Sequence, residues 1–159
     1  MPDIMPMLDA MPAGNVIAPM SAAAIDKVRA LERQAARLPQ LPIETSHLFH
    51  AGMYARTVRI PAGVMITGVL IKTATILIIS GDVVMYVEGK AKELHGYNVF
   101  AASAQRKQAF VALSDAAMTM LFPTEAKTVA AAEDEFTGEA DLLLSRRDPG
   151  SNTVTVTGE

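Results

Sequence analysis

Short apolar runs follow one another between Thr45 and Pro123, and turn residues separate them. Pro61-Ala62-Gly63, Gly68 and Gly81 are the clearest of these breaks. Apolar runs of roughly four to eight residues between such breaks are typical of β-strands. The pattern predicts about eight short strands that form a two-sheet barrel, at 54–60, 64–70, 74–80, 83–88, 91–94, 98–101, 108–113 and 117–122.

Two of these segments carry a more specific signal. Ile76-Leu-Ile-Ile79 is apolar at every position, which favours a central strand buried on both faces. Val87-Glu88-Gly89-Lys90 has the composition of a hairpin turn.

Helical periodicity flanks the strands on both sides. Residues 21–38 have an apolar stripe that includes Ile25 and Val28, Ser21 can cap the helix, and Pro39 ends it. Residues 128–147 predict a closing helix that Thr128 caps. The tail, 149–159, alternates as Asn-Thr-Val-Thr-Val-Thr, which fits either disorder or a strand added to a neighbour's sheet.

Residues 1–20 form an apolar arm that is rich in methionine and proline. Prolines at positions 2, 6, 12 and 19 exclude a long helix. The arm is either a loose chain end or a segment that docks on a neighbouring subunit, with methionine supplying adaptable contacts. The candidate interface residues are Ile4, Met5, Met7, Leu8, Met11, Val16, Ile17 and Met20.

Composition narrows the class of protein. The 159 residues are 50% hydrophobic and 19% charged, with a mean hydropathy of +0.25. These values predict one ordered domain whose apolar excess serves a rich core or a surface covered by a partner. A net charge of −3 gives no reason to expect nucleic-acid binding. The absence of cysteine excludes disulfides and thiolate metal sites.

Targeting signals do not change this picture. The longest apolar runs, such as 73–80, are shorter than the ~20 residues of a membrane helix. Asp3 and Asp9 stand where a secretory signal has basic residues. We expect no membrane partner and synthesis in a cytoplasm.

One joint pattern supports a family resemblance. His47-Leu-Phe-His50-Ala-Gly-Met-Tyr54-Ala-Arg56 is followed by Ile60-Pro-Ala-Gly63 and Thr67-Gly68. Residues 45–123 thereby resemble a group of small cupin-like proteins encoded by tailed bacteriophages. The resemblance implies an all-β core, a double-stranded β-helix or jelly roll, with flanking N- and C-terminal α-helices. Together with the patterns at both ends of the chain, this divides the sequence into an arm (1–20), a helix with a Pro linker (21–44), the barrel (45–123), a C-terminal helix (124–148) and a tail (149–159).

The resemblance also bears on metal binding. Members of that group carry His-Lys-Thr-x-His where this chain has Ile71-Lys72-Thr73-Ala74-Thr75. His47 and His50 are spaced i, i+3, which does not place them on one strand face, and His95 falls in a predicted turn. We therefore predict no metal, no cofactor and no catalytic residue.

Other polar groups have ordinary interpretations. Glu133, Asp134, Glu135, Glu139 and Asp141 read as a solvated helix face. Arg106-Lys107 reads as a solvated loop, or as a contact to an acidic partner surface.

Two functions remain open at this stage. The first is a non-enzymatic bacteriophage structural or assembly protein, a homo-oligomer that contacts other virion proteins and resides in the virion. The second is a small-molecule-binding or enzymatic cupin, whose candidate pocket would be His47, His50, Tyr54, Arg56 and Lys72. A third function, a regulatory sensor, is disfavoured because the sequence has no recognisable DNA-binding element.

Overall fold

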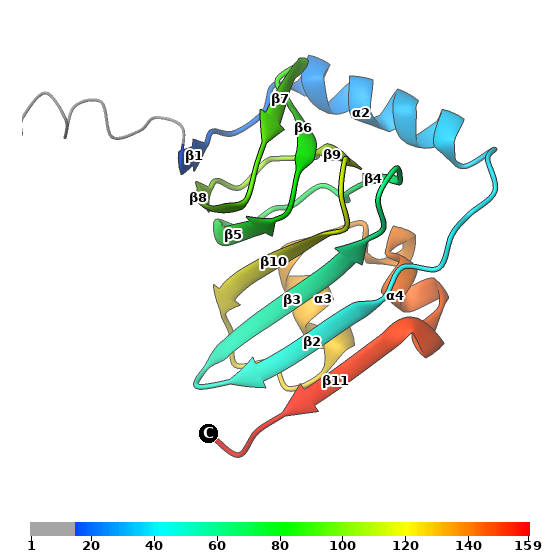
Figure 1. The fold of residues 1–159 in the computed structure, drawn as a ribbon. Coiled ribbons are helices and arrows are strands. Elements are labelled where there is room, and N and C mark those ends of the chain that lie inside the picture. The colour runs from blue at the N-terminus through cyan, green and yellow to red at the C-terminus, as the bar shows by residue number, and fades with distance from the viewer. Residues whose placement is uncertain (1–14) are drawn as a thin grey trace, which may run out of the picture.

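The computed structural model describes residues 15–159, which form two β-sheets and several flanking helices (Figure 1). One sheet has seven strands in the order β1-β8-β5-β10-β3-β2-β11, and the other has four in the order β4-β9-β6-β7. The strands are β1 (Val16–Ile17), β2 (Thr45–His50), β3 (Met53–Ile60), β4 (Met65–Thr67), β5 (Thr75–Ser80), β6 (Val83–Val87), β7 (Lys90–Leu94), β8 (Tyr97–Ala102), β9 (Ala109–Ala112), β10 (Ala116–Pro123) and β11 (Asn152–Val156).

The strand order defines a jelly roll. Counting β3 as the first strand and β10 as the eighth, the larger sheet contains the sixth, third, eighth and first strands side by side. The smaller sheet contains the second, seventh, fourth and fifth. This interleaving is that of an eight-stranded jelly roll. The predicted all-β core with flanking helices is therefore confirmed.

The helices cover two sides of the barrel. α2 (Ala22–Ala35) lies beside the four-stranded sheet, whereas α3 (Val129–Phe136) and α4 (Leu144–Arg147) lie behind β10, β3 and β2 (Figure 1). Both predicted caps are present, since the side chains of Ser21 and Thr128 accept hydrogen bonds from the first turns. None of the helices in residues 15–159 is long and apolar enough to cross a membrane.

The single closing helix predicted at 128–147 is wrong. α3 ends at Phe136, Thr137 is extended (φ −150°), and η2 (Ala140–Leu142), α4 and η3 (Pro149–Ser151) follow. The Thr137 hydroxyl donates to the Leu70 carbonyl at 2.7 Å. This side-chain bond to a residue 67 positions away in the same chain favours an extended backbone at Thr137, which Gly138 follows.

The prediction that 76–79 is buried on both faces is also wrong. Leu77 and Ile79 are 5% and 0% exposed, but Ile76 is 47% exposed. β5 lies in the middle of the larger sheet, whose outer face is uncovered in the described part of the chain. Its continuous apolar run therefore faces solvent at every second residue.

Both ends of the β-domain differ from expectation. Residues 45–50, which precede the first predicted strand, form β2 and pair antiparallel with β3. The tail forms β11, which pairs in parallel with β2 of its own chain rather than with a neighbour.

Three apolar clusters stabilise this arrangement. The largest lies between the two sheets and includes Phe100 and Ile79. A second lies between the larger sheet and α3, around Tyr54 and Phe136. A third, including Ile25, holds α2 against the barrel.

Candidate functional site

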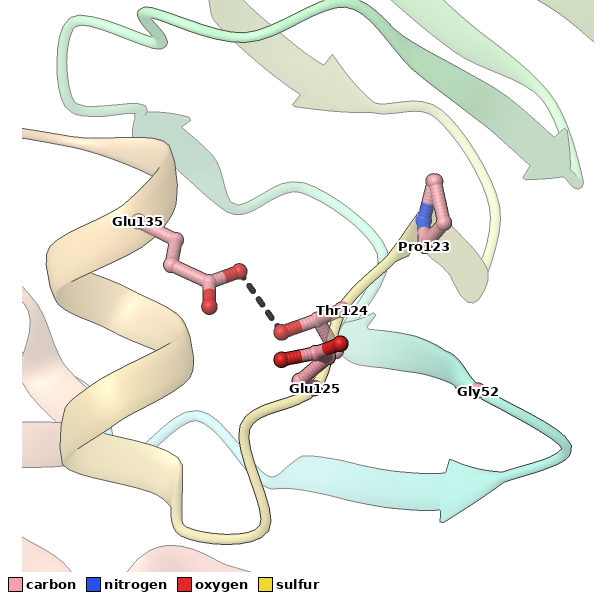
Figure 2. A pocket seen from close by; sticks show the side chains of 5 residues that line it. All are labelled: Gly52, Pro123, Thr124, Glu125 and Glu135. Carbon is pink, nitrogen blue, oxygen red and sulfur yellow. Dashed lines mark hydrogen bonds between the residues drawn. The ribbon is translucent and has the colours of Figure 1, made fainter.

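The surface hollow beside the β2–β3 turn is shallow and acidic. It is lined by Gly52, Pro123, Thr124, Glu125 and Glu135, and the Thr124 hydroxyl donates to Glu135 at 2.6 Å (Figure 2). None of the predicted pocket residues lines it. This hollow is therefore separate from the candidate site expected from the sequence.

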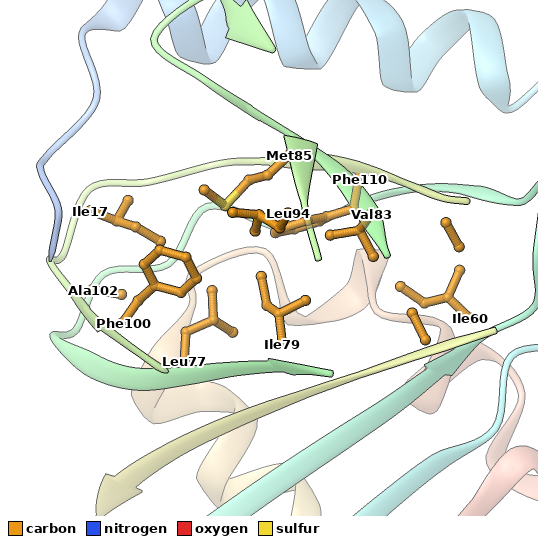
Figure 3. Close-up of a cluster of buried hydrophobic side chains, with 12 residues drawn as sticks. Ile17, Ile60, Leu77, Ile79, Val83, Met85, Leu94, Phe100, Ala102 and Phe110 are labelled. Atoms are coloured by element: carbon orange, nitrogen blue, oxygen red, sulfur yellow. The ribbon is translucent and has the colours of Figure 1, made fainter. Parts of the chain in front are cut away.

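The space between the sheets, where a barrel could hold a ligand, is filled by the protein's own side chains. Leu77 and Ile79 point from the larger sheet toward Met85, Val83 and Phe110 of the smaller sheet (Figure 3). All five are at most 5% exposed. Aliphatic and aromatic packing of this kind forms a core and presents no polar group to a substrate.

An arginine lies next to this apolar core. The Arg106 side chain is 2% exposed, and its guanidinium donates to the Thr75 hydroxyl at 2.6 Å and to the Ser103 carbonyl at 2.6 Å. Burial lowers the pKa of Arg106 to about 10. Thr75 is one of the two positions at which the resemblance places a ligand histidine. In this chain its side chain binds a cation that belongs to the protein itself.

His47 and Tyr54 form a buried hydrogen-bonded pair. The Tyr54 hydroxyl lies 2.6 Å from His47 Nδ1, and Asn152 Oδ1 lies 3.0 Å from Nε2. The amide nitrogen of Asn152 donates to the Ser145 carbonyl, so its Oδ1 is the atom that faces His47. His47 Nε2 therefore donates to Asn152 Oδ1, and His47 Nδ1 accepts from the Tyr54 hydroxyl. Burial lowers the pKa of His47 and raises that of Tyr54, and both side chains are therefore neutral.

Arg56 and Glu133 form the charged part of the same cluster. Arg56 donates to Glu133 at 3.4 Å and to the Ser145 hydroxyl at 3.2 Å. Arg146 donates to the other carboxylate oxygen at 3.2 Å. Glu133 is 1% exposed and accepts from two arginines. It thereby joins β3, α3 and α4 through one buried carboxylate.

The cluster is closed to solvent on its aromatic side. The ring of Tyr54 stacks on Phe49 and meets Phe122 edge-on, and the Arg56 guanidinium lies 5.6 Å from the ring centre of Phe136. Tyr54 is 0% exposed. These groups hold the sheet to the C-terminal segment, and His47 and Glu133 are each only 1% exposed.

The structure brings together three of the five predicted pocket residues. His47, Tyr54 and Arg56 lie in one cluster, on the inward face of neighbouring strands. His50 is exposed on the opposite face and contacts Thr157 at 2.7 Å, while the Lys72 side chain is exposed. A single pocket of all five residues is therefore wrong.

A second ionic cluster fixes α2. Lys107 is 0% exposed, and its ammonium lies 2.9 Å from Glu32 and 3.2 Å from Glu139. Arg29 also pairs with Glu139 at 2.8 Å. Burial raises the pKa of Glu139, but the hydrogen bond and charge of Lys107 lower it by more, so the net shift is downward. The interpretation of Arg106-Lys107 as a solvated loop is thus wrong.

The predicted interface residues divide into two groups. Ile4, Met5, Met7, Leu8 and Met11 lie outside the described residues. Ile17 and Met20 are 3% and 7% exposed and are buried in their own chain, whereas Val16 is 55% exposed. Of the described part of the arm, only Val16 presents a large apolar side chain to solvent.

Sequence reasoning missed Glu133, Arg106 and Lys107 as buried groups. A signal existed for Glu133, because it is four residues after Val129 and three before Phe136 and so shares their apolar helix face. For Arg106 and Lys107 no local pattern distinguishes a buried cation from a solvated one. Their partners come from distant segments.

Metal ligands do not gather in the described residues. Within 15–159, no three His, Asp or Glu side chains converge in an arrangement that could hold a metal ion. The absence of a metal stays a prediction, which metal analysis of the purified protein can test.

Comparison with known proteins bears on the fold. No protein-family model matches the chain, and no curated protein matches it. Solved structures with similar folds include the Cupin_2 domain of an XRE family transcriptional regulator from Enterobacter cloacae, with 14% identity and a TM-score of 0.41 over 52% of this chain and 99% of that one.

Two further structures show the same degree of likeness. Ectoine synthase from P. lautus has 19% identity and a TM-score of 0.46, covering 62% of this chain and 75% of its own. KdgF from Halomonas sp. has 18% identity and a TM-score of 0.43, covering 57% and 86%. At these identities the likeness concerns the fold alone.

Proposed function

We propose that this protein is a non-enzymatic structural subunit, which uses a metal-free jelly roll as an oligomerising building block. The observation that carries the proposal is the filled barrel. Side chains such as Phe100 and Ile79 pack the space between the sheets, and the Arg106 guanidinium occupies the position beside Thr75. A barrel filled in this way supplies a rigid surface rather than a reaction chamber.

The polar clusters support the same role. His47, Arg56, Glu133 and Lys107 are each committed to partners inside the chain. These contacts tie α2, α3, α4 and β11 to the barrel. A building block that must keep its shape in an assembly gains from such ties.

The resemblance to cupin-like phage proteins supports a finer proposal, that the assembly is a virion and the protein an accessory of its tail or capsid. The experiment is a density-gradient purification of particles from cells that express the gene from its own locus, followed by quantitative mass spectrometry. We expect the protein to co-migrate with particles at a constant ratio to other particle proteins. Recovery only in the soluble fraction, with low-copy particle proteins detected, would contradict the virion role.

The alternative, a small-molecule-binding cupin, has one observation in its favour. Within the described residues, the Thr73 hydroxyl and the Gln108 amide nitrogen are buried without a hydrogen-bond partner. Such atoms can mark a site for a water or a small polar ligand. A thermal-shift screen with Fe²⁺, Mn²⁺, Zn²⁺, Ni²⁺ and small carboxylates tests this alternative, and we expect no stabilisation.

A further inference from the structure

One sheet face stays open while the other apolar faces are covered. The inner face of the larger sheet packs on the smaller sheet and on α3, and α2 packs beside the smaller sheet. The larger sheet's outer face meets no other element among the described residues, and α3 and α4 lie on its far side in Figure 1.

An unbroken row of apolar residues crosses this outer face. The strand register places Ala101 between Val16 and Ile76, and continues through Leu121 and Ala55 to Leu48. Alternation along the strands points these side chains away from the core. The exposed fractions of Val16, Ile76 and Leu48 are 55%, 47% and 41%. We call these six residues the outer row: Val16, Ala101, Ile76, Leu121, Ala55 and Leu48.

The rest of the face carries almost no charge. The next row is Val99, Ile78, Thr119, Thr57 and Ser46. Arg59, near one corner, is the only permanently charged residue among the outward positions of β8, β5, β10, β3 and β2. A face with an apolar row across it and no field of one sign can meet a copy of itself without repulsion.

The size of the face suits a dimer. The seven strands span six spacings of about 4.8 Å and average about 18 Å in length, which makes a face on the order of 500 Å². Two such faces together remove roughly 1,000 Å² from solvent, which is the size at which specific interfaces begin.

We propose that two copies of this chain pack the outer faces of their seven-stranded sheets against each other, with the outer row inside the contact. This dimer contact would be the oligomerising surface of the structural subunit, and its biological role rests on the proposed function.

The test measures the mass of the purified full-length chain by light scattering and sedimentation velocity over a range of concentrations. We expect a dimer of twice 16.9 kDa. Ile76→Lys and, separately, Leu48→Lys should weaken dimerisation at least about tenfold, because each buries a charge in the contact. Leu142→Lys is the matched control, since Leu142 is 48% exposed in η2, away from this face, and it should stay dimeric.

Several results would overturn the proposal. These are a monomer at all concentrations, a dimer that survives both lysine variants with unchanged circular dichroism, or equal weakening by Leu142→Lys. A chain that lacks residues 1–14 tests whether the N-terminal arm, rather than a second copy, covers the face. If the full chain is a monomer and the truncated chain a dimer, the arm rather than a second copy covers the face. Because the assay uses isolated protein, its result is independent of whether the protein occurs in virions.

Discussion

Glu133 is the residue on which two arginines depend. Its side chain is 2% exposed and receives Arg56 and Arg146. In Glu133→Gln the shape is kept but Arg56, with a side chain 10% exposed, loses its counter-charge. Removing one member of a buried pair costs about 3–5 kcal/mol. We expect the free energy of unfolding to fall by about 3 kcal/mol in urea titrations.

The control for this prediction lies on the same helix. Glu135 is exposed, and among residues 15–159 its side chain is bonded to the Thr124 hydroxyl alone. Glu135→Gln should change the free energy of unfolding by less than about 1 kcal/mol. Equal losses in the two variants would show that the buried carboxylate does not hold the segments together.

His47 predicts how stability depends on pH. Its pKa is lowered, chiefly by burial, from 6.5 in the unfolded chain. Below pH 6.5 the unfolded state therefore binds more protons than the folded state, and stability falls as the pH falls. The slope for one proton is at most about 1.4 kcal/mol per pH unit.

His47→Gln should flatten this dependence between pH 6.5 and 5, as measured by chemical denaturation at each pH. His50→Gln is the matched control, because His50 is exposed, and it should keep the slope. Glu139 acts in a lower window, since its pKa is lowered from 4.5 and its contribution is lost only below that value. A wild-type chain with constant stability from pH 7 to 5 would refute the role of His47.

At the scale of elements, β5 tests how a continuous apolar run is used. Leu77 is 5% exposed and Ile76 is 47% exposed on adjacent positions. Leu77→Ala should cost about 2–5 kcal/mol as a core truncation, whereas Ile76→Ala in the monomer should cost less than about 1 kcal/mol. Thermal and urea unfolding at low protein concentration measure both. Similar losses would mean that the strand is covered on both faces after all.

Two glycines make opposite predictions. Gly81, at the β5–β6 turn, has φ +113°, and an added Cβ would lie 2.8 Å from the Asp115 carbonyl oxygen. Gly81→Ala should therefore destabilise the protein by more than about 1 kcal/mol. Gly138 has no atom within 4 Å of an added Cβ and no positive φ, so Gly138→Ala should be neutral or stabilise by about 0.4–1 kcal/mol. Unfolding midpoints measured side by side will show whether the signs differ.

The elements themselves were largely predictable because their signals are local. Ser21 and Thr128 cap the helices as expected, and Glu88-Gly89 forms the β6–β7 turn with φ of 51° and 72°. The closing helix was not predictable in full, since its break at Thr137 depends on the distant Leu70 carbonyl. The apolar runs predicted where strands lie but not which of their faces are buried, because periodicity does not show whether another layer covers a face.

The site was less predictable than the elements. The sequence signalled His47, Tyr54 and Arg56, but not Asn152, which bonds to His47 across 105 positions. The buried cation of Lys107 likewise depends on Glu32, 75 positions away. Such pairs form only when distant helices and strands pack together, and a single sequence does not predict that packing.

At the scale of the whole molecule, β1 ties the described start of the chain to the larger sheet, where Ile17 and Met20 are only 3% and 7% exposed. Burying each such side chain contributes about 1.5–3 kcal/mol. Removing residues 1–20 deletes β1 and both of these side chains. We expect this deletion to lower the unfolding temperature strongly relative to the full chain, as read by circular dichroism, and equal curves would contradict the core role of β1.

The first and last strands of the described chain, β1 and β11, lie at opposite edges of one sheet. Six strand spacings of about 4.8 Å separate these edges by roughly 29 Å. A peptide that joins the end of the chain to residue 15 must therefore span about nine extended residues across the sheet. Circularly permuted forms that begin at residue 15 and have shorter joints would strain one edge of the sheet.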